Sequence, residues 1–237
     1  MNNEGRTTRL IDTIGIIYKR ISHAAMRTGR SPEEVKLIAV TKTVTVLQIK
    51  EAIDAGLRTF GENRVQEART KIEELSAGSV MPPVSWHLIG HLQKNKAKYA
   101  VQLFDLIHSL DSAELAEELN SQAEKFAKVQ EVLIEVKLST EETKHGVGET
   151  ELPQLLKIVQ TMKHLRLRGL MTIPPFFEQP EKARSYFREL RELRDKAGVA
   201  GYHMPELSMG MSNDFEVAIE EGATMVRIGT AIFGERR

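Results

Sequence analysis

The sequence predicts an α/β fold, a single (β/α)8 barrel of the TIM type with one extra helix at its amino terminus. The period of the apolar pattern switches repeatedly between strand and helix, and eight such alternations fit into 237 residues. No low-complexity tract or Pro/Gly-rich linker divides the chain, so we expect one domain over residues 1–237. A doubly wound open sheet is the alternative fold.

The chain is expected to open with an amphipathic helix over residues 6–28. Leu10, Ile14 and Ile17 recur there at helical spacing. Residues 1–30 would then form a helix and linker in front of the barrel.

The barrel strands are expected in short apolar runs, each followed by a segment with helical spacing. The expected strands span residues 36–41, 58–61, 86–89, 106–109, 131–136, 165–171, 206–209 and 225–228. The expected helices between them span residues 45–55, 65–75, 92–103, 113–127, 152–162, 181–197 and 215–221.

Composition excludes several classes of protein. The 33 basic and 33 acidic residues cancel, which argues against a general nucleic-acid binder or a polybasic membrane anchor. The chain has no cysteine, which excludes disulfides, thiolate catalysis and cysteine-based zinc sites. The first residues are polar and no apolar run is long enough to span a membrane, so we expect a cytoplasmic protein.

Lys42 is the most informative single residue. It follows the apolar run 37–41, at the expected end of the first strand. Active sites of such barrels lie at the carboxyl ends of the strands. A lysine amine held there can lose its proton and form a Schiff base with an aldehyde. The same rule places further polar residues on this rim: Glu62, Asn63, Arg64, His91, Gln93, Asp111, Lys144, His145, Gly146, Thr172 and residues 209–213 and 227–230.

The loops after the seventh and eighth strands could hold a phosphate group, as they do in many barrels. Ser212 offers a hydroxyl and an amide, Gly229 permits close backbone approach, and Thr230 adds a hydroxyl. The structural alternative is that Ser212 only caps the helix at 215–221 and Gly229 only turns the chain. A lysine beside a phosphate loop suggests pyridoxal 5′-phosphate (PLP).

Two other polar features have alternatives. Arg227 could pair with a carboxylate such as Asp214, or face a ring nitrogen and keep it unprotonated, because arginine cannot accept a proton. His87 and His91 lie four residues apart, but on a strand entering a loop their rings would not share a face. We therefore predict no metal site.

Five segments carry a recognisable pattern: residues 40–42, 60–67, 86–96, 207–214 and 226–234. Together they resemble the pyridoxal phosphate homeostasis protein family, which has the barrel of the alanine racemase N-terminal domain. The resemblance runs from about residue 10 to the end of the chain.

The resemblance implies that Lys42 carries PLP as a covalent aldimine. It implies phosphate contacts from Ser212, Gly229 and Thr230, with help from Met209 or Ser208. It also implies that Arg227 approaches the pyridine nitrogen and that Asn63 lies near the cofactor.

Alanine racemases add a β domain whose tyrosine is the second base. This chain stops at Arg237, and its tyrosines, Tyr18, Tyr99, Tyr186 and Tyr202, fall in expected helices or linkers. Two-base racemisation needs a base on each face of the carbanion. We therefore expect a non-catalytic, monomeric PLP-binding protein that buffers PLP or passes it transiently to apo-enzymes. The alternatives are a weak single-domain amino-acid racemase and a Schiff-base barrel enzyme for another phosphorylated metabolite.

Overall fold

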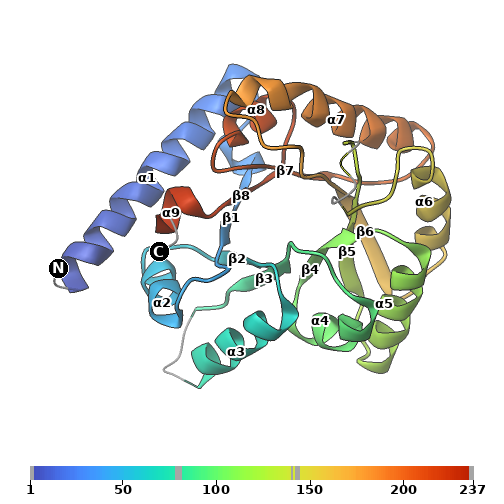
Figure 1. The fold of residues 1–237 in the computed structure, drawn as a ribbon, viewed down its shortest axis with the longest axis horizontal. Coiled ribbons are helices and arrows are strands. Elements are labelled where there is room, and N and C mark those ends of the chain that lie inside the picture. The colour runs from blue at the N-terminus through green and yellow to red at the C-terminus, as the bar shows by residue number, and fades with distance from the viewer. Residues whose placement is uncertain (1–2, 78–81, 140, 142–144, 235–237) are drawn as a thin grey trace.

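A computed structural model describes residues 3–77, 82–139, 141 and 145–234. Its parallel strands follow each other around a closed barrel, and β8 pairs with β1 (Figure 1). The strands are β1 (Lys36–Val40), β2 (Thr59–Glu62), β3 (Ser85–Leu88), β4 (Leu106–Leu110), β5 (Gln130–Glu135), β6 (Leu165–Met171), β7 (Glu206–Met211) and β8 (Met225–Ile228). Closure confirms the predicted (β/α)8 barrel and excludes the open-sheet alternative.

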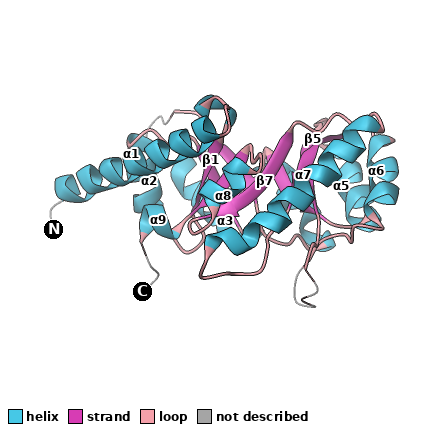
Figure 2. Ribbon diagram, turned by 90° about the horizontal axis from the view of Figure 1, so that it is seen from above, coloured by secondary structure: helices cyan, strands magenta, loops and turns pink. Residues whose placement is uncertain are grey.

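Helices surround the strands, as Figure 2 shows. They are α1 (Asn3–Arg27), α2 (Val46–Asp54), α3 (Val65–Ser76), α4 (Ala97–Leu103), α5 (Ala113–Lys125), α6 (Leu152–Gln160), α7 (Arg184–Val199), α8 (Phe215–Glu220) and α9 (Thr230–Phe233). Two helices that we expected to be α-helical throughout begin with a 3-10 turn, at Lys94–Lys96 and Pro180–Ala183. Within the described residues, no helix combines the length and apolar character needed to cross a membrane.

The predicted opening helix is α1, which lies outside the barrel against α8, α9 and α2 (Figure 1). Its apolar face is buried, with Ile17 and Ile21 almost inaccessible to solvent. Arg20 adds an ion pair to Glu216 of α8, with Nη2 and Oε2 2.7 Å apart. The helix therefore covers the place where the barrel closes between β8 and β1.

The barrel interior is packed and not a pore, as is usual for this fold. An apolar cluster of buried side chains fills part of it, including Ile38, Leu133 and Met225. Polar side chains share the interior, namely His87, His108, Ser208 and Arg227. The larger apolar core lies between the strands and the surrounding helices.

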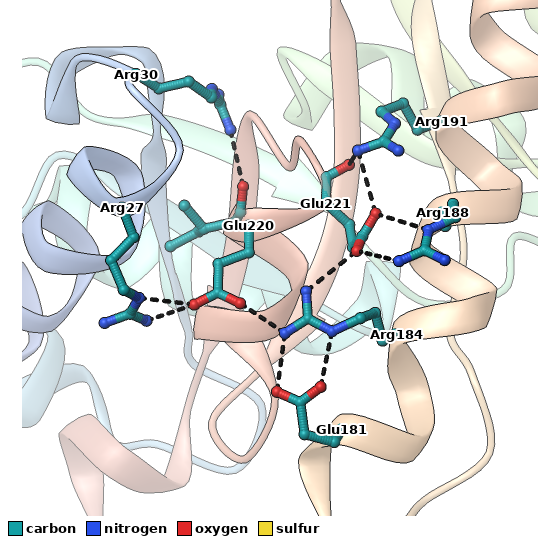
Figure 3. A network of polar contacts seen from close by, with 9 residues as sticks. Arg27, Arg30, Glu181, Arg184, Arg188, Arg191, Glu220 and Glu221 are labelled. Carbon is teal, nitrogen blue, oxygen red and sulfur yellow. Dashed lines mark hydrogen bonds and ion pairs between the residues drawn. The ribbon is translucent and has the colours of Figure 1, made fainter.

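A network of arginines and glutamates ties α1, α7 and α8 together on the outside of the barrel (Figure 3). Glu221 accepts from Arg184 at 3.1 Å and from Arg188 at 3.0 Å, and it also pairs with Arg191. Burial alone raises the pKa of Glu221, but the hydrogen bonds from Arg188 and Arg184 outweigh it and lower that pKa below its usual value. The carboxylate is therefore charged and held in place by three cations.

Replacing Glu221 with glutamine is expected to lower the free energy of unfolding by about 2 kcal/mol at neutral pH. This is less than for a fully buried pair, because the arginines stay partly solvated. The pKa of Glu221 is lower in the folded state than in the unfolded state. Its contribution to the stability of the wild-type protein is therefore complete above the unfolded pKa of about 4.3, and it is lost as pH falls through the folded-state pKa. Urea unfolding at several pH values measures both effects. Glu74→Gln, at an exposed site on α3, is the control. Equal stability of the two variants would contradict the prediction.

Candidate cofactor-binding site

A cavity of about 890 Å³ opens at the carboxyl ends of β1, β2, β7 and β8. Its volume lies within the usual range for small-molecule sites. Six of the eight residues predicted to bind the cofactor line it: Lys42, Asn63, Ser212, Arg227, Gly229 and Thr230. The fold thus brings together groups that are up to 188 positions apart in the sequence, from Lys42 to Thr230.

Lys42 follows β1 directly, and its half-buried side chain faces the cavity. The preceding Thr41 is buried and donates its backbone N–H to the Gly61 carbonyl at 2.9 Å. The following Thr43 has a φ of +64°, a strained conformation for a β-branched residue. Its N–H donates to Glu67 Oε1 at 2.7 Å, which holds this conformation.

A buried cluster behind this loop fixes the path of the chain at Lys42. The Lys71 ammonium donates to Glu62 Oε1 at 2.8 Å, to Glu67 Oε1 at 2.6 Å and to the Thr41 carbonyl at 2.6 Å. The Thr41 hydroxyl also donates to Glu62 Oε1. Lys71 therefore connects three groups whose positions determine the β1 loop.

Sequence reasoning missed Lys71 and Glu67, because on a helix such residues look like a solvated face. It also put Glu62 on the rim, whereas the structure places it fully buried within β2. Burial raises the pKa of Glu62, although hydrogen bonds from Lys71 and Thr41 oppose the shift. Glu67 lies four residues before Lys71, the spacing at which side chains of a helix can form an ion pair, and this spacing was the one signal of the cluster in the sequence.

The loops after β7 and β8 contact each other through Ser212. Its hydroxyl oxygen accepts from the Gly229 N–H and the Ala231 N–H, each at 3.3 Å. Gly229 lies so close to β1 that a Cβ would be 3.3 Å from the Val40 carbonyl oxygen, tighter than most such contacts. Ser212, Gly229 and Thr230 therefore lie together at the cavity wall, where two backbone amides donate to the Ser212 hydroxyl oxygen.

The alternative role for Ser212 as a helix cap is wrong. The residue at the N-cap of α8 is Asp214, whose carboxylate accepts from the Met211 N–H at 2.6 Å. Gly210, near the end of β7, has a φ of +90°, and a Cβ there would lie 2.6 Å from the Ala218 Cβ. Only glycine fits this bend.

Arg227 is buried on β8, and its guanidinium is held by two acceptors. Nη1 donates to Ser208 Oγ at 2.6 Å, and Nη2 donates to the Thr172 carbonyl at 2.9 Å. Burial lowers the pKa of Arg227 to about 10, partly offset by the charges of Glu135 and Asp214. Arg227 therefore stays positively charged at neutral pH and is fixed at the floor of the cavity.

A hydrogen-bond chain continues from Ser208 across the barrel interior. His108 Nδ1 lies 2.9 Å from Ser208 Oγ, and His87 Nδ1 lies 3.0 Å from His108 Nε2. Burial lowers the pKa of His87 to about 4 and that of His108 well below its usual value, so both rings are neutral. Because a guanidinium can only donate, Ser208 Oγ accepts from Arg227 and links it to the two histidines. The hydrogen-bonded chain therefore runs from Arg227 through Ser208 and His108 to His87.

Two predicted phosphate contacts are not among the residues that line the cavity. Ser208 is fully buried beneath Arg227, and Met209 is fully buried in the apolar core between the strands and the helices. The alternation of side chains along β7 explains this, because neighbouring residues of a strand face opposite sides. Ser208 supports Arg227 directly and reaches the cavity only through it. The rim prediction for Lys144 lies outside the described residues.

Phe176 and Phe177, which follow β6, lie in different environments. Phe177 packs against Tyr186, with the two ring centroids 5.9 Å apart. Phe176 instead is 75% exposed and lines the cavity mouth. The backbone there is tied down, because the Asn213 side-chain amide donates to the Phe177 carbonyl at 2.9 Å.

A closed parallel barrel with helices between its eight strands is the fold of the alanine racemase class of proteins. The model of the alanine racemase N-terminal domain family matches residues 18–237. Within that class, the chain belongs to the pyridoxal phosphate homeostasis protein family.

Relatives of this name cover nearly the whole chain. The pyridoxal phosphate homeostasis protein of Aquifex aeolicus (strain VF5) is 49% identical over 225 residues, 93% of this chain and 96% of the relative. That of Escherichia coli (strain K12) is 45% identical over 226 residues, 93% and 94% of the two chains. The structure of PipY from Synechococcus elongatus PCC7942 with PLP bound matches with a TM-score of 0.80 and 39% identity, over 92% of this chain and all of that one.

Proposed function

We propose that the chain binds PLP as a Schiff base on Lys42 and holds it for buffering or delivery, without catalytic turnover. One observation carries the proposal: Lys42, the loop of Gly229 and Thr230, and Arg227 line the same cavity. They offer an amine for the aldehyde, donors for the phosphate and a cation for the ring. The PLP bound to PipY, a relative with 39% identity, supports the same ligand here.

The residues of the cavity fit PLP in further ways. Asn63 Oδ1 is buried and has no hydrogen-bond partner within the described residues, so it can accept from a ligand. The phosphate would lie against Ser212, Gly229 and Thr230, and Arg227 would face the pyridine nitrogen. PLP supplies a reactive aldehyde and an electron sink. A permanently charged guanidinium keeps the ring nitrogen unprotonated and so weakens that sink.

The ionisable groups of the cavity favour a carrier over a catalyst. Among the described residues that line it, Lys42 and Arg227 are the only ionisable side chains. Arginine does not accept a proton, so Lys42 is left as the one base. Racemisation through a carbanion needs a base on each face. Storage or transfer of PLP needs no such pair of bases.

The open mouth of the cavity suits transfer. Lys42 is only half buried, and Phe176 beside the mouth is largely exposed. The amine of a recipient apo-enzyme could attack the carbon bound to Lys42, and Lys42 would leave as a free amine. We propose that recipients are apo PLP-dependent enzymes bound transiently, and that the carrier itself is a monomer.

An absorbance scan of the purified protein, followed by borohydride reduction and peptide mass mapping, tests the proposal. We expect a visible Schiff-base band and a pyridoxyl adduct on the peptide that contains Lys42. A colourless protein that gains no band on addition of PLP would refute the cofactor. Amino-acid racemisation at ordinary enzyme rates, abolished by Lys42→Ala, would refute the carrier role and favour the racemase alternative.

The support of Arg227 by Ser208 gives a further prediction. Ser208→Ala leaves Arg227 Nη1 and His108 Nδ1 without their shared partner, which should destabilise the fold by about 1–3 kcal/mol. If Arg227 faces the ring of PLP, its displacement should also shift the visible band. Urea unfolding and absorbance measure the two effects. Ser185→Ala, at an exposed position of α7, is the control. Equal free energies of unfolding and equal absorbance bands for the two variants would contradict the prediction.

A further inference from the structure

Three side chains of types that can bind a metal ion, from three consecutive strand-end loops, lie together beside the large cavity. We call His91, Asp111 and His145 the rim histidine cluster; they follow β3, β4 and β5 respectively. One ligand atom from each lies within 4.8 Å of the others. His91 Nδ1 is 3.4 Å from Asp111 Oδ2, and the two imidazole rings stack with centroids 3.8 Å apart.

The backbone beside His91 is tightly held. A Cβ on the preceding Gly90 would lie only 2.4 Å from the Asn63 carbonyl oxygen. The β3 loop therefore rests directly on the β2 loop, and only glycine permits this approach. His91 projects from an anchored backbone, although its own side chain is 37% exposed.

The backbone beside His145 is held as well. Gly146 has a φ of +117°, and a Cβ there would lie 2.8 Å from the Lys137 amide nitrogen. The next residue, Val147, accepts from the Lys137 N–H at 2.9 Å and donates to the Glu135 carbonyl at 2.8 Å. The chain thus returns to the end of β5 immediately after His145.

Asp111 is oriented from the other side. The Ser112 hydroxyl donates to Asp111 Oδ1 at 3.2 Å, while Oδ2 faces His91. Ser112 is itself the N-cap of α5, so its position is fixed by the helix. One carboxylate oxygen is therefore held in place and the other is directed into the cluster.

We propose that His91, Asp111 and His145 bind one divalent transition-metal ion of the zinc class. Two imidazole nitrogens and one carboxylate oxygen form a ligand set that suits zinc, cobalt or nickel, whereas magnesium and calcium prefer oxygen alone. Donors around a tetrahedral zinc ion lie roughly 3.4 Å apart. The pair of His91 and Asp111 already has this spacing, and a rotation of the exposed His145 side chain brings in the third donor.

The surroundings leave room for the ion and a fourth ligand. His91 and His145 line a small cavity of about 160 Å³, enough for water in the open coordination position. Glu135 and Lys137 line the same cavity and offset each other in charge. Ile89 and Gly90 belong to the walls of both cavities, so a bound ion would adjoin the PLP site.

The test uses untagged full-length protein stripped with a chelator and titrated with Co²⁺, whose visible bands report tetrahedral coordination. Zn²⁺ calorimetry gives the stoichiometry. We expect one ion per chain. The titration is repeated on Lys42→Ala, which lacks the proposed covalent anchor for PLP. Metal binding there succeeds or fails independently of the proposed function, because none of the three ligands is Lys42.

Variants identify the ligands. His91→Ala, His145→Ala and Asp111→Asn should each weaken Co²⁺ binding at least about tenfold. His203→Ala is the control, because His203 is exposed and precedes β7 at the opposite end of the barrel. Thermal unfolding shows whether each variant keeps the fold. Absence of saturable binding to the wild-type protein, or equal binding by the histidine variants and the control, would overturn the proposal.

Discussion

Lys42→Ala is expected to abolish both the visible Schiff-base band and the borohydride-trapped adduct. Lys42 is the only lysine among the described residues that line the large cavity, so no other amine there can replace it. The loop of Gly229 and Thr230, which we propose to hold the phosphate, remains, and the variant should still bind PLP non-covalently. We expect its affinity to fall at least tenfold, which corresponds to about 1.4 kcal/mol. Absorbance, mass mapping and equilibrium dialysis measure the three effects.

Lys98→Ala is the matched control for this experiment, because Lys98 is an exposed lysine on α4. It should keep the band, the adduct and the affinity of the wild-type protein. A stoichiometric adduct on another lysine in Lys42→Ala would show that the anchor has been misassigned. Loss of the band in both variants would show that the loss is not specific to Lys42.

Lys71→Met is expected to lower the free energy of unfolding by about 3–5 kcal/mol, the usual loss when one partner of a buried ion pair is removed. It leaves the Glu62 carboxyl group buried without the cation that pairs with it. It also frees the Thr41 carbonyl and Glu67, which hold the β1 loop at Lys42. Affinity for PLP should therefore fall together with stability. Chemical unfolding and PLP titration measure the two losses.

The free energy of unfolding of this variant is expected to depend on pH through the titration of Glu62. Burial raises the folded-state pKa of Glu62 even with Lys71 present, and removal of the cation raises it further. A raised carboxyl pKa stabilises the folded state below the unfolded pKa, and that contribution is lost as pH rises through the folded value. Lys71→Met should therefore be more stable at mildly acidic than at neutral pH.

Two further variants distinguish the effect of the unpaired charge from a general loss of stability. Lys98→Met, on an exposed helix face, should leave stability nearly unchanged. Glu62→Gln combined with Lys71→Met should recover part of the loss, because it removes the unpaired charge. A double variant no more stable than Lys71→Met alone would contradict the charge-based explanation.

The order of strands and helices was predictable from the chain because each short apolar run and each helical stripe is a local pattern. The strand at residues 165–171 and the strand at 225–228 match the structure at both ends. The four-residue helix Thr230–Phe233 was missed, since four residues are too few to show a period. The first turns of α4 and α7 differ for a similar reason: 3-10 and α geometry share the same sequence signals.

The sequence by itself determined the barrel, the lysine at the end of its first strand and the loops that could hold a phosphate. These depend on local periodicity and on the rule that strand ends share one rim. Only the tertiary structure decided which polar groups meet. It placed Ser208 beneath Arg227, buried Lys71 behind Lys42 and brought His91, Asp111 and His145 together. Such contacts join residues far apart in the chain, and their distances follow from barrel closure and strand register, which no local pattern encodes.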